Sequence, residues 1–472
     1  MNSTNLIILS LIVLLPISVI AQNSTRGTWG PVINSKVNAT GAANLPDGKI
    51  LTWSAATKED SGGSNGTQTY TAIFDPARNS FSDRLVNETR HDMFCPGTAN
   101  LPDGRIMIAG GRTTTRTTIY DPVANTYRED DEMNTPRGYQ TNVTLTDGRV
   151  FTLGGSWSGG RGNKNAEVWS QEAGWIPYPA ITANATIRQG SPDPEGVYRD
   201  DNHAWLFAAP SGRIFHAGPG TDMHWIDLNG VGSVTNAGRR ANDSYSMNGN
   251  AVMYDIGKIL TIGGASSYAA NTNSTSNTHV IDINGGNVSV TRVSNMKEAR
   301  TFHNSVVLPN GEVVTIGGMQ RSRIFSDDNA KMTAEIWNPQ TRSWTEGTAM
   351  SVPRTYHSTA ILMQDGRVWT GGGGLCGNCG VNHTDTQIYT PPYLYGSNNN
   401  VATRPVINSA PTSASYNSSI TVRSNTSISD FSLVRLSSVT HSVNVEQRRV
   451  PLNHTSSSST CLLYTSPSPR DS

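Results

Sequence analysis

The sequence has little charge, few cysteines and, after residue 20, no long apolar run. Charged residues make up 15% of its 472 residues, well below the usual quarter of a soluble chain. Lys+Arg (36) equals Asp+Glu (36), so no basic excess is available to neutralise phosphates. Four cysteines are too few for a disulfide scaffold. These shortages argue against a nucleic acid as main partner, a membrane span in the mature chain and a fold held together by disulfides.

Glycine and proline are abundant instead. The 45 glycines and 24 prolines are typical of turns and short strands, not of long charged helices. The length is several times that of an ordinary domain, so the chain has room for a large core or for more than one domain. We therefore expect an all-β protein.

The N-terminus resembles an export signal. Residues Leu6 to Ile20 are almost wholly apolar, which is short for a membrane span and suits a secretory signal, with residues 1–21 removed. The first five residues lack the usual Lys or Arg, and an uncleaved anchor is the alternative. Ten glycosylation sequons agree with a secreted glycoprotein: Asn23, Asn38, Asn65, Asn87, Asn142, Asn184, Asn273, Asn287, Asn417 and Asn425.

The C-terminus, CLLYTSPSPRDS, resembles the translation of a sequencing adapter read through from a truncated transcript. We predict that residues 461–472 are not native and exclude them from the fold. Three native cysteines then remain, Cys95, Cys376 and Cys379. An odd count in an exported protein requires an explanation for the leftover thiol.

One phrase recurs seven times along the middle of the chain. It consists of a turn with Asp-Gly or Gly, a Lys or Arg in most copies, an alternating apolar strand and often Gly-Gly, as in LPDGRIMIAGG and LTDGRVFTLGG. A second phrase, such as IYDPVANTY or IWNPQTRSW, follows several copies and is typical of a hairpin. The copies are spaced by 44 to 64 residues at their turn glycines, Gly48, Gly104, Gly148, Gly212, Gly257, Gly311 and Gly366.

Such a repeat predicts the blades of a propeller. Asp-Gly turns close hairpins, and alternation with a period of two marks half-buried strands. A repeat of about 50 residues with several strands is typical of a kelch-type blade, and blades bury their faces only by stacking in a ring. We predict a seven-bladed kelch propeller over residues 22–403. The alternative is a β-sandwich with incidental Asp-Gly turns.

The pattern changes after Arg404 to a stretch rich in Ser, Thr and Val without Gly-Gly. Residues 404–460 therefore predict the start of an immunoglobulin-like β-sandwich, truncated before its last strands.

Three groups of residues are candidates for chemistry. Cys376 and Cys379 lie in GLCGNCG, where a local disulfide is the simplest interpretation, since zinc needs two more ligands and a redox motif needs another context. Cys95 is then unpaired, either as a small buried hydrophobic residue or in a covalent bond to something other than sulfur. Tyr356-His357 and His441 are so far apart that spacing alone does not make them metal ligands.

Longer segments carry a resemblance. HDMFCPG, PRGYQ, DGRVFTLGGSWSGG, YRDDNHAWLF, ARTFHNSVVLPNG, RTYHS, GGGGLCGNCG and THSVNVEQRRVPL stand in the order of the galactose oxidase family of copper radical oxidases. The resemblance runs from Trp29 to about Leu452. The amino-terminal carbohydrate-binding sandwich of galactose oxidase has no counterpart here, because the repeats begin directly after the signal.

The resemblance implies a Cu(II) centre. Its ligands would be Tyr139, Tyr356, His357 and His441, and this N and O set suits Cu(II). Cys95 would be joined to Tyr139 by a thioether, and Trp157 would stack over the cross-linked ring. The leftover thiol would then be half of a radical cofactor. Because alcohol oxidation removes two electrons and one copper ion accepts one, the cross-linked tyrosine would store the second.

The implied reaction converts a primary alcohol or galactose-like sugar to the aldehyde and reduces O2 to hydrogen peroxide. Tyr356 would act as general base. No nucleotide or flavin is expected, because no Rossmann glycine motif follows a strand. His441 lies in the predicted second domain, so its loop would have to enter the central channel of the propeller. The protein would work as a secreted monomer on a small molecule, with no nucleic acid and no membrane span.

The substrate pocket matches the family only in part. Arg199, Tyr268 and Phe325 match family positions that contact the sugar, as does Trp157. Ser61 stands where galactose oxidase has an aromatic residue, and Ala269 stands where it has a glutamine, which predicts a changed sugar preference. Two alternatives stay open: a glyoxal-type aldehyde oxidase of the same family, and a non-catalytic kelch propeller that binds glycans or proteins.

Overall fold

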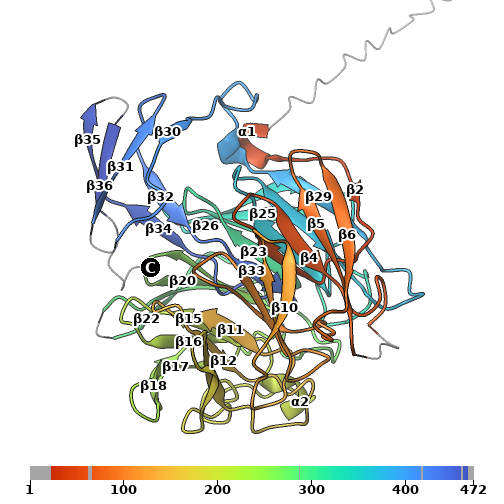
Figure 1. Cartoon of the computed structure of the whole chain (residues 1–472). Coiled ribbons are helices and arrows are strands. Elements are labelled where there is room, and N and C mark those ends of the chain that lie inside the picture. The colour runs from red at the N-terminus through yellow and green to blue at the C-terminus, as the bar shows by residue number, and fades with distance from the viewer. Residues whose placement is uncertain (1–22, 62–65, 286, 416–417, 459–460, 466–472) are drawn as a thin grey trace, which may run out of the picture.

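The computed structural model describes residues 23–61, 66–285, 287–415, 418–458 and 461–465 (Figure 1). The predicted signal peptide (1–21) and the sequons at Asn65 and Asn417 lie outside these ranges. The described chain is almost entirely β, with only the single-turn helices α1 (Asn23–Arg26) and α2 (Val197–Asp200) and a short 3₁₀ turn, η1 (Pro392–Leu394). The prediction of an all-β protein is confirmed.

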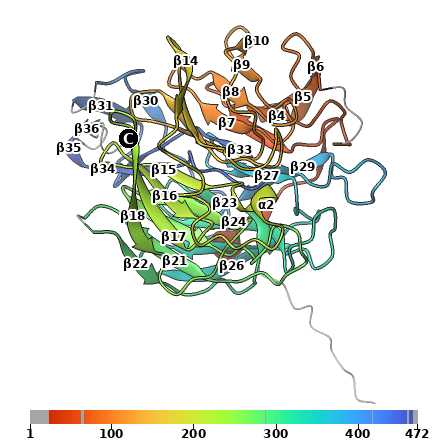
Figure 2. The same ribbon diagram turned by 90° about the horizontal axis from the view of Figure 1, so that it is seen from below.

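Seven antiparallel sheets form a ring, which confirms the predicted number of blades, and Figure 2 shows their arrangement from below. The first blade contains β3 (Gly41–Asn44), β4 (Ile50–Trp53), β5 (Thr69–Asp75) and β6 (Ser80–Val86). The second contains β7 (Gly97–Asn100), β8 (Ile106–Ala109), β9 (Thr117–Asp121) and β10 (Thr126–Asp130). The third contains β11 (Thr141–Thr144), β12 (Val150–Leu153), β13 (Ala166–Ser170) and β14 (Gly174–Tyr178). The fourth blade contains β15 (Trp205–Ala208), β16 (Ile214–Gly218), β17 (Asp222–Asp227) and β18 (Ser233–Arg239). The fifth contains β19 (Asn250–Asp255), β20 (Lys258–Ile262), β21 (Thr278–Asp282) and β22 (Ser289–Arg292). The sixth contains β23 (Thr301–Val307), β24 (Val313–Met319), β25 (Thr333–Asn338) and β26 (Ser343–Ala349).

The two ends of the propeller chain close the ring. The seventh blade contains β27 (Ser358–Leu362), β28 (Val368–Gly372) and β29 (Asp385–Thr390), and its outer edge is completed by β1 (Thr28–Trp29) and β2 (Ile33–Asn34) from the N-terminus. The first strand of each blade is fully or almost fully buried and lies next to the first strand of the neighbouring blade, except that β33 (Ser438–Thr440) lies between β3 and β7. Closure therefore leaves no gap in the ring between the seventh and the first blade.

The repeated Asp-Gly-Arg phrase is explained by the turn it forms. In the second blade, Gly104 has φ 87° and its amide donates to Leu101 O, while Asp103 Oδ1 accepts from the Arg105 amide at 3.1 Å. Arg105 Nε also donates to the Asp103 carboxylate at 2.6 Å. Glycine is required at the positive φ, and the acidic and basic residues on each side stabilise the same turn.

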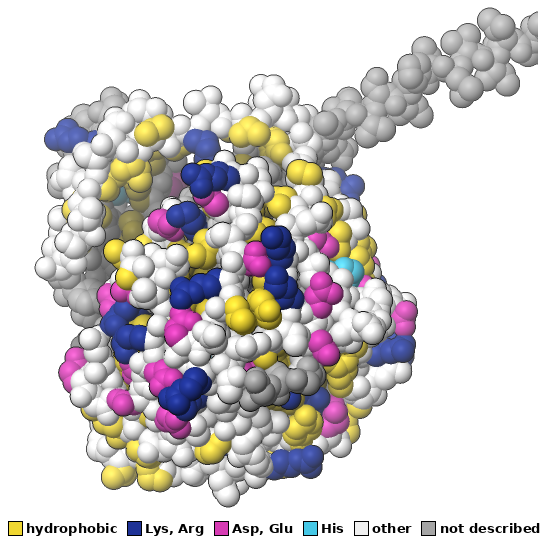
Figure 3. Space-filling view, turned by 45° about the vertical axis from the view of Figure 1, so that its right-hand side comes forward, with side chains coloured by type: hydrophobic (Ala, Val, Ile, Leu, Met, Phe, Trp, Pro, Cys, Tyr) yellow, Lys and Arg dark blue, Asp and Glu magenta, His cyan; other side chains and the backbone are white. Residues whose placement is uncertain are grey.

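The hydrophobic core lies between adjacent blades. Valine, isoleucine, leucine and tryptophan side chains of one sheet pack on those of the next, with Trp53, Trp205, Trp337 and Trp369 fully buried. The surface face in Figure 3 has Lys and Arg interspersed with Asp and Glu, as the zero net charge predicts. Within the described residues, no helix has the length and apolar character needed to cross a membrane.

The C-terminal strands form a separate unit beside the propeller (Figure 1). One sheet contains β30 (Ile407–Ser409), β31 (Ser419–Ser424), β36 (Cys461–Thr465) and β35 (His454–Ser458), and β32 (Phe431–Val434) pairs with β34 (Arg449–Leu452). β36 falls in the segment that we predict to be non-native, and that assignment and the domain boundaries stay predictions. Between β32 and β34 the chain leaves this unit as β33 (Ser438–Thr440), which pairs with β3 of the propeller.

This excursion, residues 435–448, is called the channel finger below. Most of its side chains are buried, and β33 lies among the inner strands in both ribbon views. Glu446 accepts from the backbone amides of Asn100 and Thr144, and Gln447 accepts from the amide of Val307. Inner strands of three blades therefore hold the finger in the channel.

Candidate metal centre

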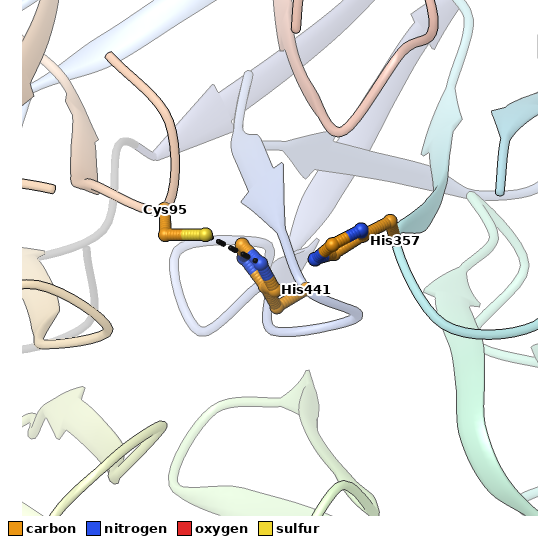
Figure 4. A group of neighbouring side chains, drawn as sticks. All are labelled: Cys95, His357 and His441. Carbon is orange, nitrogen blue, oxygen red and sulfur yellow. Dashed lines mark hydrogen bonds between the residues drawn. The ribbon is translucent and has the colours of Figure 1, made fainter. Parts of the chain in front are cut away.

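The channel finger brings His441 against residues from the second and the seventh blade, which are far apart in the sequence (Figure 4). Cys95 precedes β7 and His357 precedes β27, and both side chains point toward His441. The three ligand atoms lie within 4.8 Å of one another and all three residues are buried. Cys95 Sγ is 3.1 Å from His441 Nε2. Residues separated by 346 positions in the sequence therefore meet at one point.

Each imidazole is oriented by a hydrogen bond at its other nitrogen. His357 Nδ1 donates to the carbonyl of Gly374, and His441 Nδ1 contacts Thr440 Oγ1 at 2.8 Å. His357 Nε2 is buried and has no partner among the described residues. A metal-binding histidine has this arrangement, with one nitrogen fixed by a neighbour and the other presented to the ion.

Two tyrosines complete the group. The hydroxyls of Tyr139 and Tyr356 are 2.5 Å apart, and both rings are buried. Trp157 stacks on Tyr139 with ring centroids 4.6 Å apart and an interplanar angle of 12°. The structure thus brings together the six residues that the sequence predicts for the centre: Cys95, Tyr139, Trp157, Tyr356, His357 and His441.

Burial sets the protonation of this group. Loss of hydration lowers the pKa of His357 to about 3 and that of His441 well below the ordinary value of histidine. The same effect raises the pKa of Cys95, Tyr139 and Tyr356. In the metal-free protein the group is therefore neutral. Neutral imidazoles are the form that binds metals, and a bound cation favours phenolate over phenol.

The loop of the predicted disulfide supports the centre. Cys376 and Cys379 are bonded to each other, as predicted. The same loop begins at Gly374, whose amide donates to the Tyr356 carbonyl at 2.9 Å and whose carbonyl accepts from His357. This loop therefore fixes both members of the Tyr356-His357 pair.

The predicted substrate residues lie beside the tyrosines. The guanidinium of Arg199 lies 4.1 Å from the centroid of the Tyr268 ring, and its Nε and Nη1 are buried without a hydrogen-bond partner among the described residues. The Tyr268 hydroxyl donates to that of Tyr356 at 3.4 Å. Phe325 is 38% exposed and its ring centroid is 5.3 Å from that of Tyr356. Donors without partners and an exposed aromatic ring are features of a small-molecule site.

Ser61 and Ala269, the two positions that depart from the family, make their hydrogen bonds here through backbone atoms. The Ser61 amide donates to Leu375 O at 3.2 Å, and its carbonyl accepts from Arg112. Ala269 is half-buried, and its amide donates to Glu195 Oε2 at 2.8 Å. Neither residue presents a large side chain, and the Glu195 carboxylate lies beside Ala269.

His203 belongs to the centre and was not among the residues predicted from the sequence. Its ring centroid lies 4.7 Å from that of Tyr139 and 5.3 Å from that of His441, and its Nε2 contacts the Tyr268 hydroxyl at 3.1 Å. Its backbone amide donates to the Tyr139 carbonyl. Burial lowers the pKa of His203 to about 3, so the ring is neutral.

The repeat contains a signal that would have found His203. Cys95, Tyr139, His203 and His357 each precede the turn glycine of their own blade by nine residues. The same position has φ between 54° and 70° in all four, the left-handed region that residues other than glycine rarely adopt. Such backbone strain gathers at functional sites. Alignment of the blades at their turn glycines therefore places His203 at the position that Cys95, Tyr139 and His357 occupy in their own blades.

Two sequons are incompatible with the fold. Asn38 and Asn142 have 0% and 3% exposure, so neither can carry a glycan in the folded protein. Glycosylation at the exposed sequons stays a prediction, and these two positions do not count toward it.

Comparisons with known proteins agree with this geometry. A family profile described as "Galactose oxidase-like, Early set domain" matches residues 404–472, and one described as "Glyoxal oxidase N-terminus" matches residues 242–419. A galactose oxidase of Gibberella zeae is 42% identical over 94% of this chain, and the chain spans 66% of that relative's length. An aldehyde oxidase GLOX of Vitis pseudoreticulata is 26% identical over 76% of this chain and 72% of its own length.

A solved structure matches nearly the whole chain. It is a fungal alcohol oxidase of the AA5 family in complex with copper, with a TM-score of 0.88, 37% identity and coverage of 93% of both chains.

Proposed function

The chain belongs to the galactose oxidase family of copper radical oxidases, and on this basis we propose that it is a copper-dependent alcohol oxidase. The reaction proposed is oxidation of a primary alcohol or galactose-like sugar to the aldehyde, with reduction of O2 to hydrogen peroxide. The observation that carries the proposal is the convergence of two imidazoles and two phenols, with His357 Nε2 buried and without a partner in the described chain.

The donor set fits copper. Imidazole nitrogens and phenolate oxygens suit Cu(II), and each of the four donors is held by packing in the buried channel. His357 and His441 would bind through Nε2, since their Nδ1 atoms already have partners. Copper, when bound, supplies a one-electron acceptor. The second electron acceptor is proposed to be the Tyr139 ring.

Cys95 is proposed to be joined to Tyr139 by a thioether bond. The S–H hydrogen and one ring hydrogen leave, the sulfur–carbon bond forms, and O2 takes the two electrons and two protons as hydrogen peroxide. Cys95 is buried and is the one cysteine outside a disulfide in the described propeller. A sulfur substituent spreads an unpaired electron beyond the ring, and the stacked Trp157 excludes water from one face of it.

The remaining roles follow from contacts. Tyr356 is proposed to accept the proton of the alcohol hydroxyl, and its own hydroxyl lies between those of Tyr139 and Tyr268. Arg199 is proposed to bind substrate oxygens with its free donors, and Phe325 and Tyr268 form apolar walls. A hydrogen atom of the alcohol carbon would pass to the phenoxyl oxygen of Tyr139 in its one-electron-oxidised form, and the second electron would pass to the bound copper. O2 would then take up the two electrons and two protons as hydrogen peroxide and restore the oxidised site.

A glyoxal-type aldehyde oxidase is the second candidate, favoured by the profile match over residues 242–419. Secretion and a monomeric state also remain part of the proposal.

The test combines mass and turnover. Copper loading in air should lower the intact mass by the two hydrogens lost in the thioether, and a Cys95→Ala variant should show no such loss. Peroxide release is then measured with galactose, simple primary alcohols and methylglyoxal. Turnover of methylglyoxal alone would favour the aldehyde oxidase. An unchanged mass with a free Cys95 thiol and no peroxide would favour a non-catalytic propeller.

A further inference from the structure

Two carboxylates hold the segment that carries Tyr268. Asp193 Oδ2 accepts from the Tyr268 amide at 2.7 Å, and Glu195 Oε2 accepts from the Ala269 amide at 2.8 Å. Both acids precede α2, which carries Arg199. Glu195 is therefore fixed at the wall of the pocket by one of its oxygens, while the other oxygen is directed toward Arg199.

The contact between Glu195 and Arg199 is incomplete. Glu195 Oε1 is 3.6 Å from Arg199 Nε, which is longer than a hydrogen bond. Arg199 Nε and Nη1 have no hydrogen-bond partner among the described residues. The Glu195 side chain is 29% exposed and that of Arg199 is 8% exposed, so the carboxylate lies nearer to solvent. A polar contact of this length is suited to a bridging group.

We propose that Glu195 is a specificity-determining residue that, together with Arg199, recognises a second hydroxyl of the substrate. A hydroxyl both accepts from a guanidinium and donates to a carboxylate. A substrate carboxylate satisfies Arg199 but is repelled by Glu195, and an ammonium group meets the opposite conflict. A methyl group leaves Arg199 Nε and Nη1 without a hydrogen-bond partner and takes water away from the Glu195 carboxylate, which is costly. The substrate class is therefore a polyol or sugar, not a simple or charged alcohol.

This inference rests on the proposed function, because it concerns the same pocket. It adds a residue that the family resemblance does not assign and a rule for which alcohols bind. Ala269 has no polar side chain of its own. The polar group at this position is instead the Glu195 carboxylate, which accepts from the Ala269 amide and lies 3.6 Å from Arg199 Nε.

The test uses four alcohols of equal chain length that differ only at the far end: 1,5-pentanediol, 1-pentanol, 5-amino-1-pentanol and 5-hydroxypentanoate. In the wild-type protein we expect kcat/KM to be highest for the diol, by about tenfold, the value of one hydrogen bond to a charged group. In Glu195→Gln the amide oxygen still accepts from the Ala269 amide, and the negative charge is lost. The ratio of 5-hydroxypentanoate to diol should then rise by about tenfold. Glu172→Gln, an exposed acid on the hairpin between β13 and β14, is the control and should leave all ratios unchanged.

Two results would overturn the inference. One is equal kcat/KM for 1-pentanol and the diol in the wild-type protein. The other is a Glu195→Gln variant that loses the same factor on all four alcohols, because that pattern indicates mere support of the Tyr268 wall. Saturation-transfer NMR with the copper-free protein separates this inference from the proposed function. Preferential binding of the diol without turnover would uphold the recognition of a hydroxyl while refuting the oxidase.

Discussion

Glu446 is predicted to hold the channel finger, and with it His441, in the propeller. Its carboxylate accepts from the Asn100 amide at 2.7 Å and from the Thr144 amide at 2.9 Å, and also from the Thr144 hydroxyl. In Glu446→Gln only one oxygen remains as acceptor, and the amide NH2 must face a backbone N–H. One charge-assisted hydrogen bond is lost and one buried donor is left unpaired, which together cost about 3 kcal/mol.

The free energy of unfolding of the copper-free protein, measured with urea, should fall by that amount. Hydrogen exchange of the peptide that contains residues 435–448 should be faster in the variant, since loosening begins at the finger. Glu346→Gln is the matched control, because Glu346 lies on β26 with its side chain 45% exposed and should change stability by less than about 0.5 kcal/mol. Equal unfolding free energies for the two variants, with unchanged exchange of the finger, would refute the reasoning.

Three further predictions concern the radical site, acid stability and glycosylation. Trp157→Ala removes the indole stacked on Tyr139, so copper binding should persist while the visible absorption of the tyrosyl radical decays faster; an unchanged lifetime would contradict a shielding role. Burial lowers the pKa of His91 to about 4, so the unfolded chain takes up a proton first as the pH falls. As the pH falls from 6.5 to 4, the free energy of unfolding should therefore decrease, by about 2 kcal/mol at pH 5. Measured with urea, this decrease should be smaller in His91→Gln. Peptide mapping of protein from a glycosylating host should find Asn38 and Asn142 unmodified and exposed sequons such as Asn184 occupied; a glycan on either buried asparagine would contradict the fold.

The propeller was predictable because its signals are local. Each blade contains a turn such as Asp103-Gly104-Arg105, whose backbone hydrogen bonds and Asp–Arg contacts lie within five residues, and seven copies leave little ambiguity. The odd cysteine count was also informative, since pairing Cys376 with Cys379 isolates Cys95. The convergence of Cys95, Tyr139 and His441 came from resemblance and not from spacing.

What the sequence did not reveal depends on contacts between blades. His203 is an ordinary histidine until the turn glycines are aligned, because its neighbours Tyr139 and Tyr268 lie 64 and 65 residues away. Asn142 has the same sequon as an exposed asparagine, and only the burial of its strand distinguishes it. The Glu195 contact with Ala269 joins loops 74 residues apart, and no local pattern encodes it.

The geometry of the ring explains why a finger from another domain is needed. Four blades contribute one side chain each to the centre from the same place, just before the innermost strand, namely Cys95, Tyr139, His203 and His357. A ring alone leaves its axis open, so a metal there would lack a ligand along the channel and would be accessible from both ends. The channel finger supplies His441 along the axis and fills the channel on the side of the Glu446 contacts. Phe325 is exposed and Arg199 has donors without partners, so the insertion that completes the proposed ligand set would also leave this face as the one from which the proposed alcohol enters.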